Sequence, residues 1–122
     1  MSIDTKRVYA LPAAGDGYRV LVDRLWPRGL SRAVAAIDLW IRDVAPSTEL
    51  RRWFDHEVER WPEFVARYRR ELASHGDLLD LILDLERQHD TVTLLFGARD
   101  ELHNEAEVLA EVLRDRPHHS HH

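Results

Sequence analysis

The chain has 122 residues and no cysteine, which excludes disulfide bonds, thiolate metal sites and cysteine nucleophiles. Hydrophobic residues make up 44% and charged residues 32%, a balance typical of a folded globular domain and not of a disordered or membrane-spanning chain. The net charge of −5 argues against broad non-specific nucleic-acid binding but permits a local basic pocket. The N-terminal residues lack the layout of a signal peptide, so we expect a cytoplasmic protein that does not enter a membrane.

Two strands and a short helix are predicted in the first third of the chain. Residues 6–10 form a short strand, and residues 18–25 form a second one, whose apolar centre suits a parallel sheet covered on both faces. Pro27 and Gly29 end this second strand. Ser31 then stands where it can cap a short helix that extends through residue 36.

The middle of the chain changes from an extended to a helical pattern. Residues 37–44 alternate apolar and polar side chains, which favours an extended segment that Pro46 ends. Ser47 occupies the N-cap position of the helical residues that follow it. A longer helix begins near Trp61, with a proline in its first turn and a buried stripe formed by Phe64, Tyr68 and Leu72.

The last third of the chain is predicted to contain two helices and one strand. Gly76 is expected to end the long helix, and the residues from 78 to 85 belong to another amphipathic helix that ends before Asp90. Residues 91–96 form an apolar strand. A final helix runs from about residue 102 to residue 113.

Strands that alternate with helices predict one compact three-layer α/β domain over residues 1–117. Its small sheet is expected to be at least partly parallel and flanked by helices. Residues 118–122 are rich in histidine and are expected to form a disordered tail. In open parallel sheets, ligands bind beyond the carboxyl ends of the strands, so the loops that follow the two clear strands are the places where a site is expected.

Polar side chains gather in both of these loops. The first loop is Asp23-Arg24-Leu25-Trp26-Pro27-Arg28-Gly29, and the second contains Arg99, Asp100 and His103. If the two strands are parallel neighbours, both loops open at one edge of the sheet and share a cleft.

The residue types in this expected cleft suit an anionic ligand. Guanidinium groups bind phosphate or carboxylate through paired hydrogen bonds, which nominates Arg24, Arg28 and Arg99. Trp26 offers a face on which a base or another flat ring can stack. Asp23 is expected to orient an arginine or a water molecule. Because all but one of the 17 basic residues are arginine, arginine abundance alone does not indicate a site.

Several of these residues also have a structural interpretation. Asp100 beside His103 suits a proton-transfer pair, but Asp100 equally suits the N-cap of the last helix. Trp26 is more readily explained as a packed anchor than as a stacking platform. Ser47 and Arg51 are further candidates for ligand binding, although a helix cap and a solvated helix face explain them more readily.

The sequence carries no motif for a metal or a cofactor. It contains no glycine-rich dinucleotide motif, no phosphate-binding P-loop and no His-Glu-x-x-His pattern. We therefore expect neither a metal nor a cofactor. The expected partner is a small anionic or phosphate-bearing ligand, such as a nucleotide or a nucleic-acid component, and the oligomeric state is left open.

Longer runs of sequence point to a known family. The runs are Lys6-Arg7-Val8-Tyr9, Asp16 to Gly29 with its Val-Asp-Arg-Leu-Trp-Pro-Arg-Gly motif, Asp38-Leu39-Trp40, Ala45-Pro46-Ser47 and Thr93-Leu94-Leu95. With them, nearly the whole chain resembles the YeaO-like branch of the uncharacterised family called domain of unknown function 488. The resemblance implies a compact three-layer α/β domain without an established activity, and a nucleotide- or nucleic-acid-related role as a prior expectation.

The chain also departs from the pattern of that family. The family usually has lysine where this chain has Arg42 and Arg99, which lowers the odds of Schiff-base or lysine general-base chemistry. More distant relatives carry Cys-His-Arg where this chain has Leu102-His103-Asn104. Thiol chemistry is therefore excluded here, and only the histidine could keep a shared role.

Three functions remain open from the sequence. The first is an enzyme that acts on a phosphate-bearing substrate, with Asp23, Asp100 and His103 as its catalytic residues. The second is a module that binds an anion or a partner without catalysis. The third is a purely structural loop, in which Asp23 and Arg28 pair with each other or with Asp38 and Asp43.

Overall fold

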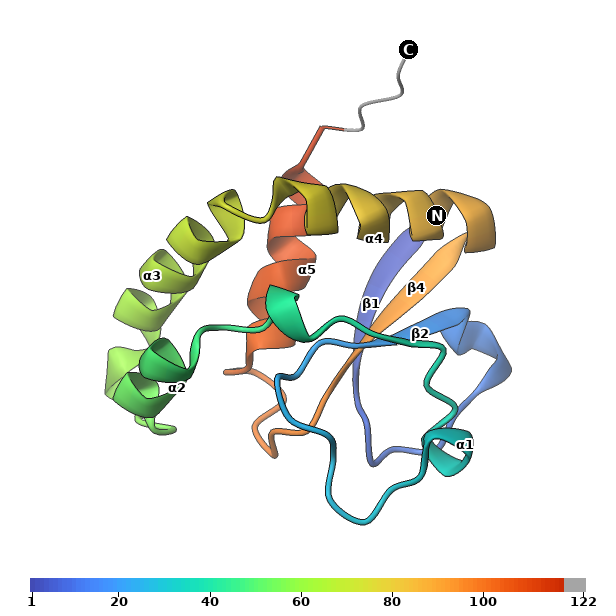
Figure 1. Ribbon diagram of the computed structural model, residues 1–122, viewed down its shortest axis with the longest axis horizontal. Coiled ribbons are helices and arrows are strands. Elements are labelled where there is room, and N and C mark those ends of the chain that lie inside the picture. Colours follow the sequence, from blue (N-terminus) through green and yellow to red (C-terminus); the bar gives the residue numbers. More distant parts are fainter. Residues whose placement is uncertain (118–122) are drawn as a thin grey trace.

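The computed structural model describes residues 1–117 and shows helices packed on a four-stranded sheet (Figure 1). The strands are β1 (Ser2–Arg7), β2 (Tyr18–Leu21), β3 (Leu39–Trp40) and β4 (Thr91–Phe96). They lie in the order β1-β4-β2-β3, and every neighbouring pair is parallel. The predicted α/β class is confirmed, and the sheet is parallel throughout the described residues.

The helices occupy the connections between the strands. They are α1 (Arg32–Ala35), α2 (Thr48–Phe54), α3 (Trp61–Ala73), α4 (Gly76–His89) and α5 (Glu105–Asp115). Short 3-10 turns lie at Ala14–Asp16, Arg42–Val44 and Val58–Arg60. None of the helices among residues 1–117 is long and apolar enough to cross a membrane.

The two faces of the sheet are covered unequally. Val20 and Leu94 belong to the larger core, to which α3, α4 and α5 contribute their buried faces. Leu21 and Leu95 point to the other face, because successive side chains of a strand alternate between faces. That face is covered by the short α1 and the loop that carries Trp26, so the third layer is thin.

Local signals placed most of the helices correctly. Ser31 and Ser47 accept hydrogen bonds from the backbone N–H groups of Val34 and Leu50, so both predicted caps are confirmed. The proline-led start of α3 and its buried stripe of Phe64, Tyr68 and Leu72 are also confirmed. The Tyr68 hydroxyl donates to the backbone oxygen of Val44 over 2.6 Å, and this bond ties α3 to the turn before α2.

The boundaries of all three strands predicted in the first 44 residues were wrong. The first strand is Ser2–Arg7 and not residues 6–10, because it pairs with β4 along its whole length despite few apolar residues. The second strand ends at Leu21, and residues 37–44 give only a two-residue strand followed by a 3-10 turn.

The remaining differences concern the helices of the second half. Gly76 begins α4 instead of ending α3, which already ends at Ser74 with a backbone bond to Glu71. The last helix begins at Glu105, because residues 97–104 form a loop. The predicted tail at residues 118–122 lies outside the described residues.

Candidate functional site

The loops that leave β2 and β4 meet at one edge of the sheet. The two strands are parallel neighbours, with Leu21 opposite Leu95, and the backbone N–H of Val22 continues the pairing to the oxygen of Leu95. One residue further, the Asp23 carboxylate oxygen Oδ2 accepts a hydrogen bond from the backbone N–H of Gly97 over 2.8 Å. This bond joins the two loops, so the predicted neighbourhood of the two strand exits is confirmed.

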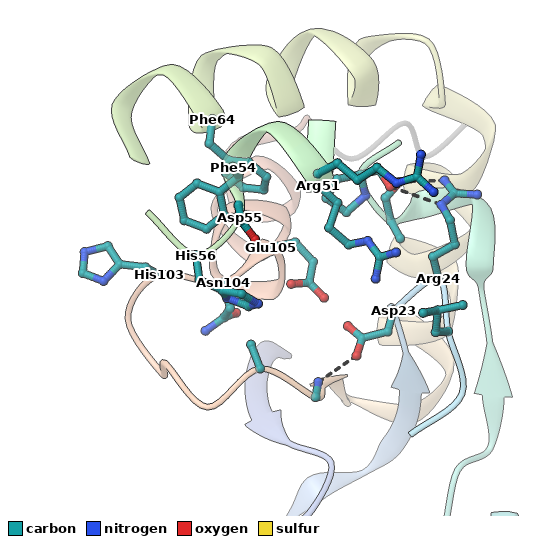
Figure 2. Close-up of a pocket in the computed structure, with 16 residues that line it drawn as sticks. Asp23, Arg24, Arg51, Phe54, Asp55, His56, Phe64, His103, Asn104 and Glu105 are labelled. Atoms are coloured by element: carbon teal, nitrogen blue, oxygen red, sulfur yellow. Dashed lines mark hydrogen bonds between the residues drawn. The ribbon is translucent and has the colours of Figure 1, made fainter. Parts of the chain in front are cut away.

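A cavity of about 470 Å³ opens at this junction, a size that lies within the range of about 300–1,000 Å³ found for small-molecule sites. Its walls come from both exit loops, from α2 and the residues just after it, and from the first turn of α5 (Figure 2). The charged and polar residues that line it are Asp23, Arg24, Arg51, Arg52, Asp55, His56, His103, Asn104 and Glu105.

Two carboxyl groups face each other in the cavity. Glu105 is the first residue of α5, and its carboxyl group points toward Asp23 (Figure 2). The pKa of Glu105 lies well above its usual value, because of burial first, and then because of the charge of Asp23 and a side-chain hydrogen bond with it. The residue as a whole is half-buried, while its carboxyl end is more closely surrounded by protein atoms. The two carboxyl groups therefore act on each other, and Glu105 resists ionisation more than an exposed glutamate does.

Arginines from two segments line the same cavity. The Arg24 guanidinium is fixed by hydrogen bonds of 3.2 Å to the backbone oxygens of Ala45 and Pro46, which leaves its other N–H groups available. Arg51 and Arg52 lie on α2 and are exposed to solvent. The charge of Arg51 acts on Glu105 and lowers its pKa, a smaller effect than the burial that raises it.

Asp100 and His103 form a local pair at the rim. Asp100 accepts hydrogen bonds from the backbone N–H groups of His103 and Leu102, and these lower the pKa of its carboxyl group. The other carboxylate oxygen of Asp100 lies 2.9 Å from Nδ1 of His103. The rings of His103 and Trp61 pack in a T-shaped arrangement, with 5.2 Å between their centroids. The His103 ring projects away from the carboxyl pair in Figure 2, and Asp100 itself does not line the cavity. The hydrogen bonds between Asp100 and His103 therefore hold the conformation of the loop, and the His103 ring does not point toward Asp23 and Glu105.

The N-cap of α5 is Asn104, which corrects the alternative interpretation of Asp100 as that cap. The Asn104 side-chain oxygen accepts from the backbone N–H of Glu107, and its amide donates to the backbone oxygen of Asp100. Both polar atoms of Asn104 are thus already bonded, although the residue lines the cavity. Its role is to fix the start of the helix that carries Glu105.

Besides Asp100, four of the predicted site residues lie away from the cavity. Arg28 and Arg99 are exposed and do not line it. The loop turns at Pro27 toward the Tyr9 hydroxyl, which donates to the backbone oxygen of Arg28. Arg7 donates to the backbone oxygen of Ala98, and the chain then bulges outward at Arg99. The expected shared cleft thus contains Arg24 and His103, but neither of these two arginines.

The other two residues are engaged in packing and capping. The Trp26 ring nitrogen donates to the backbone oxygen of Leu30 over 2.7 Å, and the ring packs edge-on against Trp40 in the smaller core. Ser47 donates through its hydroxyl and its backbone N–H to the two carboxylate oxygens of Glu71, and it caps α2. Neither side chain has a polar group left that points into the cavity.

Sequence reasoning missed five of the charged and polar residues of the cavity wall, which are Arg52, Asp55, His56, Asn104 and Glu105. Glu105 carried only a weak signal, an acidic residue directly after a predicted polar exit loop. Asp55 and His56 follow α2 with φ angles of 46° and 57°, a left-handed conformation that non-glycine residues rarely adopt. Backbone strain of this kind is concentrated at functional sites, but the sequence does not reveal it.

Asp23 does not bond to the partners that the purely structural interpretation predicted for it. Asp23 bonds to Gly97 and Glu105, while Asp38 accepts from the backbone N–H of Arg19. Within residues 1–117, no group of three or more histidine, aspartate or glutamate side chains is arranged to hold a metal ion. The side chains that line the cavity offer charge and hydrogen-bonding groups.

Comparison with known proteins identifies the family. The chain is 43% identical to the uncharacterised protein YeaO of Escherichia coli over 114 residues, which cover 93% of this chain and 98% of that protein. It is 41% identical to the uncharacterised protein Rv3073c of Mycobacterium tuberculosis over 110 residues, 90% of this chain and 92% of the relative. No solved structure matches. A family model described as "Inactive DUF488-N3 subclade" matches residues 2–121, and the chain therefore belongs to this subclade as a YeaO-like member of the DUF488 family.

Proposed function

We propose that the cavity at the ends of β2 and β4 binds a small phosphate-bearing ligand and does not catalyse a reaction on it. The observation that carries this proposal is the presence of arginines from two segments around a pair of carboxyl groups that face each other. Guanidinium groups bind phosphate through charge-assisted hydrogen bonds, which are about twice as strong as neutral ones.

The charge balance of the cavity supports an anionic ligand. Three arginines and three carboxyl groups line it, and the carboxyl groups are those of Asp23, Asp55 and Glu105. If all three carboxyl groups were ionised, these charges would cancel. Burial and the charge of Asp23 raise the pKa of Glu105, so this carboxyl group contributes less negative charge than an exposed glutamate would. This shift makes the cavity more favourable for an anion.

The set of side chains supports binding without catalysis. Among the described residues that line the cavity there is no serine, threonine, lysine or tyrosine to act as a nucleophile. The description of the subclade as inactive agrees with this composition. Among the described residues of the lining, the imidazoles are those of His56 and His103, and His103 is held at the rim by Asp100.

Titration of the protein with a phosphate monoester, followed by calorimetry and by thermal unfolding, tests the proposal. A ligand at about 100 times its Kd stabilises the folded state by about 2.7 kcal/mol. Replacing Arg51 with glutamine (Arg51→Gln) should weaken binding about ten-fold, because a charge-assisted hydrogen bond contributes about 1.5–3 kcal/mol. Arg87→Gln is the matched control, because Arg87 is an exposed helical arginine on α4 that does not line the cavity. Equal binding by both variants, or none by the wild type, would refute the proposal.

A second candidate function is an enzyme that acts on the same class of ligand. The observation that favours it is the carboxyl pair, because two neighbouring carboxyl groups, of which one has a raised pKa, resemble the general acid and base of many hydrolases. In that case Glu105→Gln abolishes turnover while binding persists. Incubation of the protein with phosphate monoesters, followed by phosphorus NMR, separates the two functions, since a binding protein leaves the ligand unchanged.

A further inference from the structure

We propose that the ligand is a phosphate monoester that also carries neighbouring hydroxyl groups, as a sugar phosphate does. The phosphate would lie against Arg24 and Arg51, and the hydroxyl groups would donate to Asp23 and Glu105. This inference rests on the proposed function, because it presumes that the cavity holds a phosphate.

The carboxyl pair has more acceptor positions than the protein fills. Each carboxylate oxygen can accept two hydrogen bonds. Among the described residues, the hydrogen bonds to the pair come from the backbone N–H of Gly97, from the backbone N–H of Glu105 itself and from the side-chain bond between the two groups. Asp23 and Glu105 both line the cavity, so a ligand that supplies O–H donors can use the remaining acceptor positions.

The two kinds of group lie on different sides of the cavity. In Figure 2 the carboxyl groups of Asp23 and Glu105 lie at the centre, and the side chain of Arg24 rises beside them toward the loop before α2. Arg51 enters from α2, close enough for its charge to act on Glu105. A ligand that satisfies both sides therefore needs an anionic end and a hydroxyl-bearing end.

Simpler ligands satisfy only one of the two sides. Inorganic phosphate uses the arginines but brings no hydroxyl-bearing carbon chain to the carboxyl pair. A neutral sugar supplies the donors but leaves the guanidinium groups without an anion. An amine would be attracted by Asp23 but repelled by the three arginines that line the cavity. The combination of the two groups is found in a phosphorylated sugar.

The apolar part of the wall is compatible with such a ligand. The side chains of Phe54 and Phe64 line the cavity and are otherwise buried. They can cover the carbon atoms of a sugar ring, while the polar groups around them fix its orientation.

The experiment compares ribose 5-phosphate with ethyl phosphate, which has the same anionic group and no hydroxyl groups. Calorimetry on the wild type should give at least about ten-fold tighter binding of ribose 5-phosphate, since hydrogen bonds to charged groups are worth about one order of magnitude each. In Glu105→Gln and Asp23→Asn this preference should fall at least several-fold, while the affinity for ethyl phosphate does not fall. Both replacements keep an oxygen acceptor and add N–H donors in place of acceptor positions, and asparagine can still accept from Gly97.

The outcomes separate this inference from the proposed function. Equal affinities for the two phosphates would overturn the inference and leave the proposed function standing. A preference that persists unchanged in Glu105→Gln would also overturn it, and this variant avoids the loop contact that Asp23 makes with Gly97. No binding of either phosphate would overturn the proposed function itself.

Discussion

Two regions of this molecule combine aspartates with arginines, and they differ in how many hydrogen-bonding groups are left over. The first lies at the start of β2, where Arg19 is 3% exposed. Its guanidinium donates to the backbone oxygens of Ala35 and Ala36 and forms an ion pair with Asp16. Lys6 completes the arrangement with bonds of 3.2 and 3.0 Å to the same carboxylate. We call these three side chains, Lys6, Asp16 and Arg19, the closed network.

The second region is the cavity at the other end of the same strand. Here the carboxyl groups of Asp23 and Glu105 face each other, Arg24 uses only part of its donors, and Arg51 is exposed. The difference shows how a scaffold can be told from a binding site. A buried ion pair whose groups are all bonded stabilises a fold, whereas surplus donors and acceptors around a cavity suit a ligand.

The largest expected effect tests the closed network. Arg19→Met should lower the free energy of unfolding by about 3–5 kcal/mol, because it leaves Asp16 and two backbone oxygens without their buried partner. Arg51→Met in the cavity should change it by less than about 0.5 kcal/mol, since Arg51 is exposed. Urea denaturation of both variants measures the contrast. Similar losses in the two variants would remove the distinction between the regions.

The next effect concerns the turn that leads into the closed network. Gly17 has a φ angle of 63°, and a β-carbon added there would lie 2.3 Å from the backbone oxygen of Thr91. Gly17→Ala should therefore destabilise the fold by about 3 kcal/mol, through overpacking and left-handed strain together. Gly15→Ala is the control, because nothing lies within 4 Å of its added carbon. Thermal unfolding that shows equal changes for both would contradict this view of the turn.

A smaller effect is expected at the start of α5. Asn104→Ala removes the cap of this helix and the bond to the backbone oxygen of Asp100, at a cost of about 1–2 kcal/mol. Because Asn104 positions Glu105, affinity for a phosphate ligand should also fall. Asn104→Asp keeps the capping oxygen and should recover most of the lost stability. If the aspartate variant is as unstable as the alanine variant, the cap is not the cause.

The smallest effect is a pH dependence with an unusual sign. Because the folded-state pKa of Glu105 is raised, folding becomes less favourable as the pH rises above the ordinary glutamate value of 4.5. Above this pH, Glu105 loses its proton in the unfolded chain but keeps it in the folded chain. The loss of stability ends once Glu105 also ionises in the folded chain. Glu105→Gln removes this dependence, so the variant gains stability over the wild type as the pH rises. Denaturation between pH 4 and pH 8 measures the gain, with Glu101→Gln, on the exposed loop, as the control.

The sequence was sufficient for the features that depend on near neighbours. The caps at Ser31 and Ser47 and the stripe of α3 follow from residues within one or two helical turns. An at least partly parallel sheet was also predicted, because buried apolar strands joined through helices favour it. The pairing of β2 with β4 entered only as a condition, which the structure meets.

The composition of the site depended on contacts that the sequence does not contain. Glu105 becomes notable only because α5 brings it to Asp23, a residue more than eighty positions earlier in the chain. Arg28 and Arg99 were nominated by their place after a strand, but both are exposed and lie outside the cavity. Near them, the Tyr9 hydroxyl donates to the backbone oxygen of Arg28, and the Arg7 side chain donates to the backbone oxygen of Ala98. Such long-range contacts do not follow from residue type.

The most direct test of the difference between the two regions is an NMR titration of ¹⁵N-labelled protein with ribose 5-phosphate. We predict saturable shifts of the backbone amides of Gly97, Ala98 and Glu105, which surround the carboxyl pair, and none at Gly17 or Arg19 in and beside the closed network. Shifts centred on Gly17 and Arg19, or no shift at any of these amides, would contradict the assignment of the cavity as the binding site.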